Sequence, residues 1–370
     1  MSGTADVAVI GAGPVGLAIA WRCAERGMRV VVRDPAPGSG ASAVAAGMLA
    51  PVAEAYFGEE PLTRLLVGSA ARWPRFAADL HAASGMDLGY RAEGTLVVAL
   101  TGDDLAEAER LWTYQTGLGL PITPLRPAAL REREPLLAPR LRGGAYAPGD
   151  HQVDPRRLVP ALRAALDGAG VPVRPEAVGA LSTVDARVVV VAAGCGTAPL
   201  TGLPIRPVKG QILRLRAPGG APPGFLHVIR GYADGRHVYL VPRADGEVVV
   251  GATVEERGDC AVTASAVLEL LRAAAALLPE IAEYELVEAR AGLRPGTPDN
   301  APVLGALPDR PGVIVAAGHY RHGIVLTPVT AELIADLVST GVPDPALAPF
   351  GPGRFLSSRF LRGEADSGWN

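Results

Sequence analysis

Lysine is almost missing from this chain of 370 residues, because Lys209 is the single lysine in it. Arginine therefore supplies nearly all of the 35 basic side chains, and 38 acidic residues outnumber them to give a formal net charge of −3. No basic excess is present to neutralise a phosphate backbone. The composition thus argues against nucleic acid as a partner.

Cysteine and long apolar runs are also scarce. The three cysteines, Cys23, Cys195 and Cys260, are odd in number and irregular in spacing, which argues against a disulfide framework or a zinc site. The first apolar run, VAVIGAGPVGLAIAW, has no basic leader and is interrupted by glycines, and no later run is long enough to span a bilayer. We therefore expect a cytoplasmic protein with no stable membrane association.

The length predicts two domains, and the order of elements suggests how the chain divides. A strand at 6–10, a glycine turn, a helix at 15–25 and a second strand, MRVVVRD, form a βαβ unit. Further helices are predicted at 61–83, 105–116 and 262–278, and in the segments DPRRLVPALRAALDGAG and TPVTAELIADLV. Between residues 207 and 253 the pattern is rich in strands.

This order predicts an α/β fold in two parts, with ligands bound where the parts meet. One part is a discontinuous, Rossmann-like nucleotide-binding domain made of residues 1–85, 140–210 and 288–350. The other is a mixed, mainly antiparallel α+β substrate lobe made of residues 86–139 and 211–287. The remaining tail, 351–370, is polar and rich in glycine, and we expect it to fray.

The first βαβ unit carries a dinucleotide-binding fingerprint. Gly11 allows the tight turn out of the strand, Gly13 lets the backbone approach a pyrophosphate, and Gly16 lets helix and strand pack closely. The N-terminus of the helix then faces the anion. Asp34 ends the next strand, where its carboxylate can bind ribose hydroxyls. The spacing in this strand–turn–helix context indicates a bound dinucleotide rather than a tight turn alone.

Small residues at three strand ends favour FAD over NAD. The strands VVVVAAG and VIVAAG end at Gly194 and Gly318, as the first strand ends at its glycine turn. Together these ends leave a groove for a long flat ligand, although each alone is also typical of ordinary parallel-strand core. The small-residue loop containing Ala46, Gly47 and Met48 would border the isoalloxazine ring; a flexible linker is the alternative.

An arginine lies at the end of another predicted strand, in the segment AGLRPGTPDNAP. Pro, Gly and Asn supply turn chemistry directly after Arg294, so its side chain is delivered at a strand terminus. A guanidinium there can grip a carboxylate with two parallel bonds. On this fragment alone, a surface arginine capping a loop is the simpler interpretation.

A predicted hairpin brings two further polar residues together. In RHVYLVPRADGEVVVGATVE, Asp245-Gly246 indicates a two-residue turn, so that Tyr239 would face Ala252 and His237 would face Val254. His237 and Tyr239 are two residues apart and therefore share one face of the sheet. Ordinary sheet and core positions are the alternative for both.

Taken together, these motifs resemble the glycine oxidase branch of the D-amino-acid oxidase family of FAD-dependent amine oxidases. The resemblance runs in order from residue 6 to about residue 338, through AAGMLAP, PVKGQ, VYLVPR and VVVGATVE. Its most specific parts are AGLRPGTPDNAPVLG and AAGHYRHGIVLTPVTAELIADL.

The resemblance implies roles for particular residues. Arg294 and Tyr239 would hold the substrate carboxylate, while Arg321 and His237 would form the pocket wall. It also adds four residues to the FAD site: Val178, His319, Gly323 and Ile324.

The implied activity is oxidative deamination of glycine, sarcosine and small D-amino acids with O2. The products would be an imine or glyoxylate, ammonia and H2O2, and the imine would supply thiamine thiazole synthesis, with thiazole synthase as a possible partner. No cysteine lies in the C-terminal part, so FAD is expected to be non-covalent. We also expect a homo-oligomer.

Some features leave alternatives open. The chain is short between Val178 and Val188, with little room for a peripheral hairpin. Lys209 is a strand residue, or else a positive charge that favours electron transfer to oxygen. Alternative functions are a D-amino-acid dehydrogenase that passes electrons to a quinone, a general D-amino-acid oxidase, a flavin-binding protein without catalysis, and an NAD-linked dehydrogenase.

Overall fold

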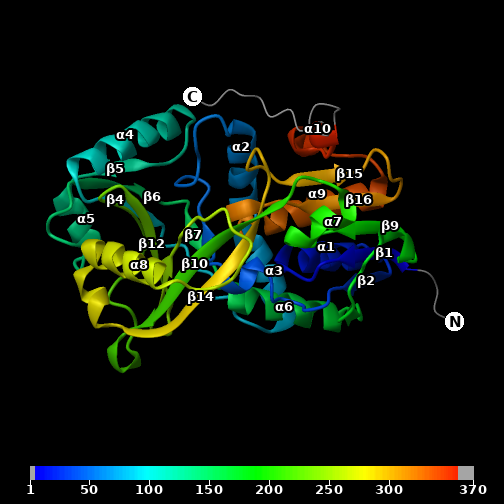
Figure 1. Cartoon of the computed structure of the whole chain (residues 1–370), viewed down its shortest axis with the longest axis horizontal. Helices are drawn as coiled ribbons and strands as arrows, with labels where there is room; N and C mark the ends of the chain where they lie inside the picture. The colour runs from blue at the N-terminus through cyan, green and yellow to red at the C-terminus, as the bar shows by residue number, and fades with distance from the viewer. Residues whose placement is uncertain (1–4, 357–370) are drawn as a thin grey trace.

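The computed structural model describes residues 5–356, which form two sheets lying side by side along the long axis of the molecule (Figure 1). One sheet has six strands in the order β15-β16-β9-β1-β2-β8, and the other has eight in the order β14-β10-β13-β12-β11-β4-β6-β5. A small third sheet pairs β3 (Met48–Leu49) with β7 (His151–Gln152). The expected combination of a Rossmann-like sheet with a mixed, mainly antiparallel second sheet is confirmed.

The six-stranded sheet is parallel apart from its edge strand β15. Its strands are β1 (Ala5–Ile10), β2 (Val30–Arg33), β8 (Val173–Arg174), β9 (Ala186–Val191), β15 (Val303–Ala306) and β16 (Val313–Ala317). The register aligns Ile10 with Val191 and Val191 with Val315. Consequently β1, β9 and β16 end at one edge, as the sequence predicts.

Helices cover this parallel sheet. An apolar layer packs one face against α1 (Pro14–Glu25), α2 (Glu60–Ala70), α3 (Trp73–Ser84), α6 (Pro155–Gly168) and α9 (Thr327–Thr340). The opposite face packs against the segment around α7 (Thr197–Thr201) and against α10 (Gly353–Leu356). The buried, nearly continuous valine runs of β1 and β9 are what a sheet covered on both faces requires.

The eight-stranded sheet is antiparallel except where β4 runs parallel to β11. Its strands are β4 (Thr95–Ala99), β5 (Thr123–Leu125), β6 (Gly143–Ala147), β10 (Arg206–Arg216), β11 (Val228–Ala233), β12 (Arg236–Pro242), β13 (Glu247–Gly251) and β14 (Glu285–Gly296). Side chains along each strand point alternately to the two faces of this sheet. Leu213 and Leu215 pack under α8 (Ala264–Leu277), whereas Ile212 packs on the other face. The sheet ends near α4 (Gly102–Gly117) and α5 (Pro127–Arg133).

Short 3-10 segments complete the description. They are η1 (Ala41–Val44), η2 (Leu181–Thr183), η3 (Gly194–Gly196), η4 (Pro218–Gly220), η5 (Pro279–Glu283), η6 (Tyr320–His322) and η7 (Pro345–Phe350). Only η2 lies between β8 and β9, which agrees with the lack of room for a hairpin there. The boundaries expected at 210 and 288 fall inside β10 and β14, so a division that follows the sheets would place these strands whole in the second lobe.

Two expectations are wrong in detail, and one strand is missing from the predictions. The helix at 61–83 is two helices, because Pro74 lies in the first turn of α3 and cannot continue a preceding helix. In the hairpin after β12, the N–H of Arg243 donates to the carbonyl oxygen of Glu247, so three residues connect this pair, and Gly246 among them takes a φ of 89°. Tyr239 therefore pairs with Gly251, not Ala252, and the predicted contact of His237 with Val254 is lost. Strand β11 was not predicted, since VIRGYA alternates too weakly to stand out.

The start of the tail is packed rather than frayed. Phe350 and Phe355 are buried, and Arg354 donates hydrogen bonds to the carboxylate of Asp299 and to the carbonyl oxygens of Ala301 and Pro302. The apolar side chains and the guanidinium anchor this segment on the turn after β14. The expectation for 357–370 lies outside the described residues.

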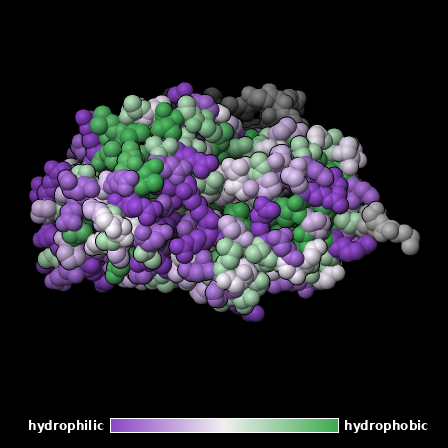
Figure 2. All heavy atoms as spheres, turned by 90° about the horizontal axis from the view of Figure 1, so that it is seen from below, coloured by the Kyte–Doolittle hydropathy of each residue, from purple (hydrophilic) through white to green (hydrophobic). Residues whose placement is uncertain are grey.

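The face seen in Figure 2 is largely polar, with apolar residues gathered at the end of the molecule that holds the eight-stranded sheet. No helix between residues 5 and 356 is both long and apolar enough to cross a bilayer.

Candidate functional site

The glycine turn after β1 has the geometry that its sequence predicts. Gly11 takes a φ of 112°, and a side chain there would overlap the backbone of Ala192 at the end of β9. A side chain at Gly16 would overlap the carbonyl oxygen of Gly11, so helix α1 packs directly on the turn. Gly13 instead faces open space and caps α1 without any side-chain hydrogen bond. The turn therefore leaves room for an anion at the helix N-terminus.

Asp34 is hydrogen-bonded to this turn. Its carboxylate accepts hydrogen bonds from the backbone N–H groups of Ala12 and Ala36, both at 2.7 Å. The acid thus lies beside the glycine turn, where the fingerprint requires it.

The ends of β9 and β16 lie at the same edge of the sheet. Gly194 faces open space, and Gly318 takes a φ of 74° with Thr297 packed against it. Val178 is half-buried against the apolar layer under β1 and β2. Gly13 after β1 and Gly194 after β9 are open, whereas Gly318 after β16 is not. The two open glycines and the N-terminus of α1 fit the extended FAD that the sequence predicts.

The small-residue loop is fixed in place. A side chain at Gly47 would overlap the carbonyl oxygen of Val153, and the carbonyl oxygen of Ala46 accepts a hydrogen bond from buried Arg243. Met48 begins β3 and packs against the face of the second sheet that also holds Tyr239. These contacts argue against a flexible linker, and the role of the loop at FAD stays a prediction.

Arg294 lies near the end of β14, with its guanidinium over the backbone of β10. It donates hydrogen bonds to the carbonyl oxygens of Lys209 at 3.3 Å and Thr253 at 3.1 Å. Gly210 makes this possible, since a side chain there would overlap the guanidinium. Among residues 5–356, no carboxylate lies within ion-pair distance of Arg294.

Tyr239 shares this face of the sheet. It pairs with Gly251, which pairs with Ile212 on β10, and its hydroxyl extends over Gly251. Burial raises the pKa of Tyr239, more than the positive charges of Arg294 and Arg230 lower it. The hydroxyl therefore stays protonated and can donate a hydrogen bond beside Arg294.

A partly buried ion pair, absent from the sequence-based predictions, borders these residues. Glu54 pairs with Arg230, which lies directly opposite Tyr239 on β11, and the Arg321 Nε lies 3.9 Å from the second oxygen of Glu54. Burial raises the pKa of Glu54, but Arg230, Arg321 and His322 outweigh burial and bring it to about 2. Glu54 and the buried Asp150 are the acidic groups beside the three arginines, so the site keeps an excess of positive charge.

His237 lies on the same face but toward solvent. Its side chain is 62% exposed, 3.6 Å from Glu107 of α4, with its ring 4.5 Å from that of Tyr232. Val254 is also exposed. Their exposure to solvent places both residues outward from Tyr239.

The remaining predicted residues follow β16. The side chains of His319 and Ile324 are buried in the protein, and His319 Nε2 lies 3.1 Å from the Thr330 hydroxyl. Gly323 follows η6 and has no side chain, so the backbone atoms of these three residues are the candidates for cofactor contacts.

Other residues at the site were not found from the sequence, although each had a signal. Glu54 is a lone acid after the apolar loop, Arg230 interrupts a strand, and Arg243 ends VYLVPR. A charged residue within an apolar pattern indicates a buried ion pair or a site, but a single sequence does not reveal its partner.

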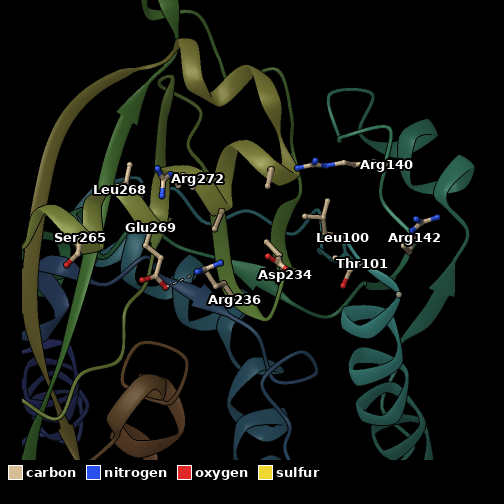
Figure 3. Close-up of a pocket in the computed structure, with 14 residues that line it drawn as sticks. Leu100, Thr101, Arg140, Arg142, Asp234, Arg236, Ser265, Leu268, Glu269 and Arg272 are labelled. Atoms are coloured by element: carbon tan, nitrogen blue, oxygen red, sulfur yellow. Dashed lines mark ion pairs between the residues drawn. The ribbon is translucent and has the colours of Figure 1, made fainter.

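A separate hollow of about 750 Å³ lies between α8, the start of α4 and the β11–β12 turn (Figure 3). Four arginines line it with Asp234 and Glu269, and Glu269 pairs with Arg236 at 3.7 Å. None of the residues predicted from the sequence lines this hollow, so we do not assign the chemistry to it.

Two buried imidazoles next to the site predict how stability depends on pH. Burial lowers the pKa of His319 to about 3 and that of His322 to about 4, from 6.5. Below pH 6.5 these two histidines therefore bind more protons in the unfolded chain than in the folded protein, and they lower stability as the pH falls. Burial raises the pKa of Asp150 to about 7, so this carboxyl group acts in the opposite direction and offsets part of the loss. At pH 5 each histidine should cost about 2 kcal/mol relative to neutral pH.

The urea midpoint of the holoprotein at pH 7 and pH 5 measures this loss. His322→Gln removes one of the two titrations and should shrink the difference between the two midpoints. An equal loss in the wild-type protein and in His322→Gln would contradict the assignment.

Comparison with known proteins agrees with this geometry. The family model "FAD dependent oxidoreductase" (DAO) matches residues 6–337. Glycine oxidase of Geobacillus kaustophilus is 36% identical, with 93% of this chain and 96% of that protein covered. Its crystal structure has a TM-score of 0.86 at 35% identity, covering 94% of this chain and 98% of that one.

Two other relatives extend the comparison. The crystal structure of glycine oxidase from Bacillus cereus is 28% identical with a TM-score of 0.84, covering 93% of this chain and 97% of that one. The bifunctional protein ThiO/ThiG of Synechocystis sp. is 34% identical over 97% of this chain, which spans 55% of that protein. The chain therefore belongs to the DAO family of FAD-dependent oxidoreductases and is a homologue of the glycine oxidases.

Proposed function

We propose that this enzyme oxidises glycine and other small amines, namely sarcosine and small D-amino acids, with O2. The observation that carries the proposal is the guanidinium of Arg294, which has backbone acceptors but no carboxylate partner among the described residues and lies on the same sheet face as Tyr239. The names of the relatives from Geobacillus and Bacillus support glycine as the substrate.

Arg294 and Tyr239 would bind the substrate carboxylate. A guanidinium can give two parallel charge-assisted hydrogen bonds, and the protonated phenol of Tyr239 can add a third. The ion pair of Glu54 with Arg230 keeps Glu54 anionic, so Arg321 and Arg294 leave the site positive toward an anion. Together these groups would orient Cα and keep water from the carboxylate.

Gly11, Gly13, Gly16, Asp34 and the strand end at Gly194 would hold FAD at the edge of the parallel sheet. When bound, FAD supplies the acceptor for the hydride equivalent leaving Cα and returns the electrons to oxygen as peroxide. The imine product hydrolyses to glyoxylate and ammonia. Removal of a hydride equivalent from Cα requires no strong base on the protein, because the substrate amine needs only to be bound in its neutral form.

We propose that FAD is bound without a covalent link. Cys23 is buried in α1, Cys195 contacts the carbonyl oxygen of Leu293 at 3.8 Å, and Cys260 is exposed in the loop before α8. Acid precipitation of the holoprotein should release the yellow colour into the supernatant. Colour that stays in the pellet would refute non-covalent binding.

The relatives fused as ThiO/ThiG support a wider role. We propose that the imine supplies thiamine thiazole synthesis, with thiazole synthase as the partner, in the cytoplasm. We also propose a homo-oligomer. The leading alternative activities are a D-amino-acid dehydrogenase that passes electrons to a quinone and a general D-amino-acid oxidase.

Replacing Arg294 tests the carboxylate site. Arg294→Lys loses the bidentate geometry, and with charge-assisted bonds worth about 1.5–3 kcal/mol each, kcat/KM for glycine should fall by roughly 100-fold. Tyr239→Phe removes one neutral donor and should be milder. FAD content, measured by absorbance, should be unchanged in both variants.

A matched pair of glycine variants tests the position of the Arg294 guanidinium without replacing Arg294 itself. Gly210→Ala keeps Arg294 but crowds its guanidinium, and it should also lower kcat/KM. Gly168→Ala, near the end of α6 with open space around it, should not. Wild-type kcat/KM in Arg294→Lys would show that the carboxylate binds elsewhere.

A peroxide-release screen tests the substrate range. Glycine and sarcosine should react with comparable efficiency, D-alanine detectably and D-phenylalanine poorly. An apolar pocket distinguishes substrates that differ by one methylene by only about 10–200-fold, whereas the benzyl group of D-phenylalanine is much larger. Preference for D-phenylalanine would indicate general D-amino-acid oxidation. No peroxide from any of them, with FAD bound and bleached by glycine without oxygen, would favour the dehydrogenase.

A further inference from the structure

The only lysine of the chain is buried behind the proposed carboxylate site. Lys209 is fully buried in β10, and its side chain lies on the sheet face that packs under α8, opposite the face of Arg294. Its Nζ lies 2.7 Å from Asp259 Oδ1 and 3.8 Å from Glu255 Oε2. A buried ammonium requires such partners, because an unpaired one is strongly unfavourable.

The backbone of Lys209 is part of the cradle that holds Arg294. Its carbonyl oxygen accepts one hydrogen bond from the guanidinium and another from the N–H of Glu255 at 3.0 Å. The second acceptor for the guanidinium, the carbonyl oxygen of Thr253, lies two residues before Glu255. Both carbonyl groups that orient Arg294 thus belong to β10 or to the segment 253–263 paired with it.

Gln211 fastens the same segment two residues further along β10. Its side-chain amide donates to Glu255 Oε1 at 2.7 Å and to the Thr263 hydroxyl at 3.2 Å, and its oxygen accepts from the Thr263 N–H at 2.8 Å. Thr263 also caps α8. The segment is therefore held at its end by Gln211 and at its middle by the ion pair of Lys209 with Asp259.

We propose that the Lys209–Asp259 ion pair is a positioning device that fixes the orientation of Arg294 for carboxylate binding. The inference rests on the proposed function, since it assumes that Arg294 binds the substrate carboxylate. Without the ion pair, only the bonds of Thr253 and Glu255 to Lys209 and Gln211 hold this segment on β10. The carbonyl of Thr253 is then less firmly fixed, and it is one of the two acceptors of the guanidinium. Preorganisation of the site, rather than charge at the substrate, is what Lys209 contributes.

This role differs from that of a charge promoting electron transfer to oxygen. A positioning residue changes the affinity for carboxylates, whereas a charge acting on oxygen reduction changes turnover at saturating substrate. The ammonium is paired with Asp259 and lies on the face away from Arg294, which favours positioning.

Steady-state kinetics of the holoenzyme variants test the proposal. In Lys209→Met, the KM for glycine and the inhibition constant of acetate should rise together, by roughly 10-fold, because a small misplacement of a binding group costs this much or more. The kcat at saturating glycine should stay within about threefold of the wild-type value. Asp259 is 40% exposed and can be hydrated once its partner is lost, so this variant should fold.

Asp259→Asn provides a second route to the same loss, and the double variant should be no worse than the more affected single variant. Glu134→Gln is the matched control. It removes a buried carboxylate that contacts His227, the residue before β11, away from β10. The variant should lower stability without changing either constant.

Each contrary outcome has a distinct meaning. Unchanged KM and acetate inhibition in both Lys209→Met and Asp259→Asn would overturn the proposal. A fall in kcat alone in Lys209→Met would overturn it in favour of a charge that acts on oxygen reduction. An equal rise of KM and of the acetate inhibition constant in Glu134→Gln would overturn it as well, because any loss of stability would then weaken carboxylate binding. If Arg294→Lys itself leaves both constants unchanged, the proposed function fails rather than the positioning.

Discussion

The pairing of β10 with β14 is the interaction on which the site depends. The two strands pair from Arg206 with Gly296 to Arg216 with Glu285, across a bulge beside Leu215. Figure 1 shows them running from the second lobe toward the parallel sheet. Since Arg294 lies on one strand and its acceptor Lys209 on the other, the register of this ladder decides where the guanidinium points.

Buried charge is concentrated around this ladder. Glu54 with Arg230 and Lys209 with Asp259 lie on opposite faces of the eight-stranded sheet, and Arg243 holds the loop at Ala46. Such pairs add little net stability, because removing charges from water costs as much as their attraction returns. Their value is that each has one low-energy arrangement, so they fix neighbouring loops that carry no regular structure.

Local patterns were sufficient to predict the parallel sheet and its glycine turn. GAGPVG lies between a valine-rich strand and a helix, and the chemistry of Gly11 and Gly16 requires no distant residue to interpret. The position of Arg294 at a strand end was also predictable, because a turn sequence follows it directly. Its partner groups were not, since Lys209 and Thr253 come from segments that only the sheet brings together. The hairpin register failed for a related reason: Asp245-Gly246 fits both a two-residue and a three-residue connection, and packing chooses between them.

The order of strands in the parallel sheet has a consequence for how the chain folds. Ala5 pairs with Ala186, and Val189 pairs with Val313, so long stretches of sequence separate β1 from β9 and β9 from β16. Such non-local pairing gives a high contact order, and the loop-closure entropy must be overcome before the pairing contributes any stability. During synthesis, β1 and its glycine turn leave the ribosome long before β16 exists to complete the edge. The cofactor groove is therefore a late product of folding, and nascent chains that end before β16 should depend on chaperones to shield the apolar faces of β1 and β9.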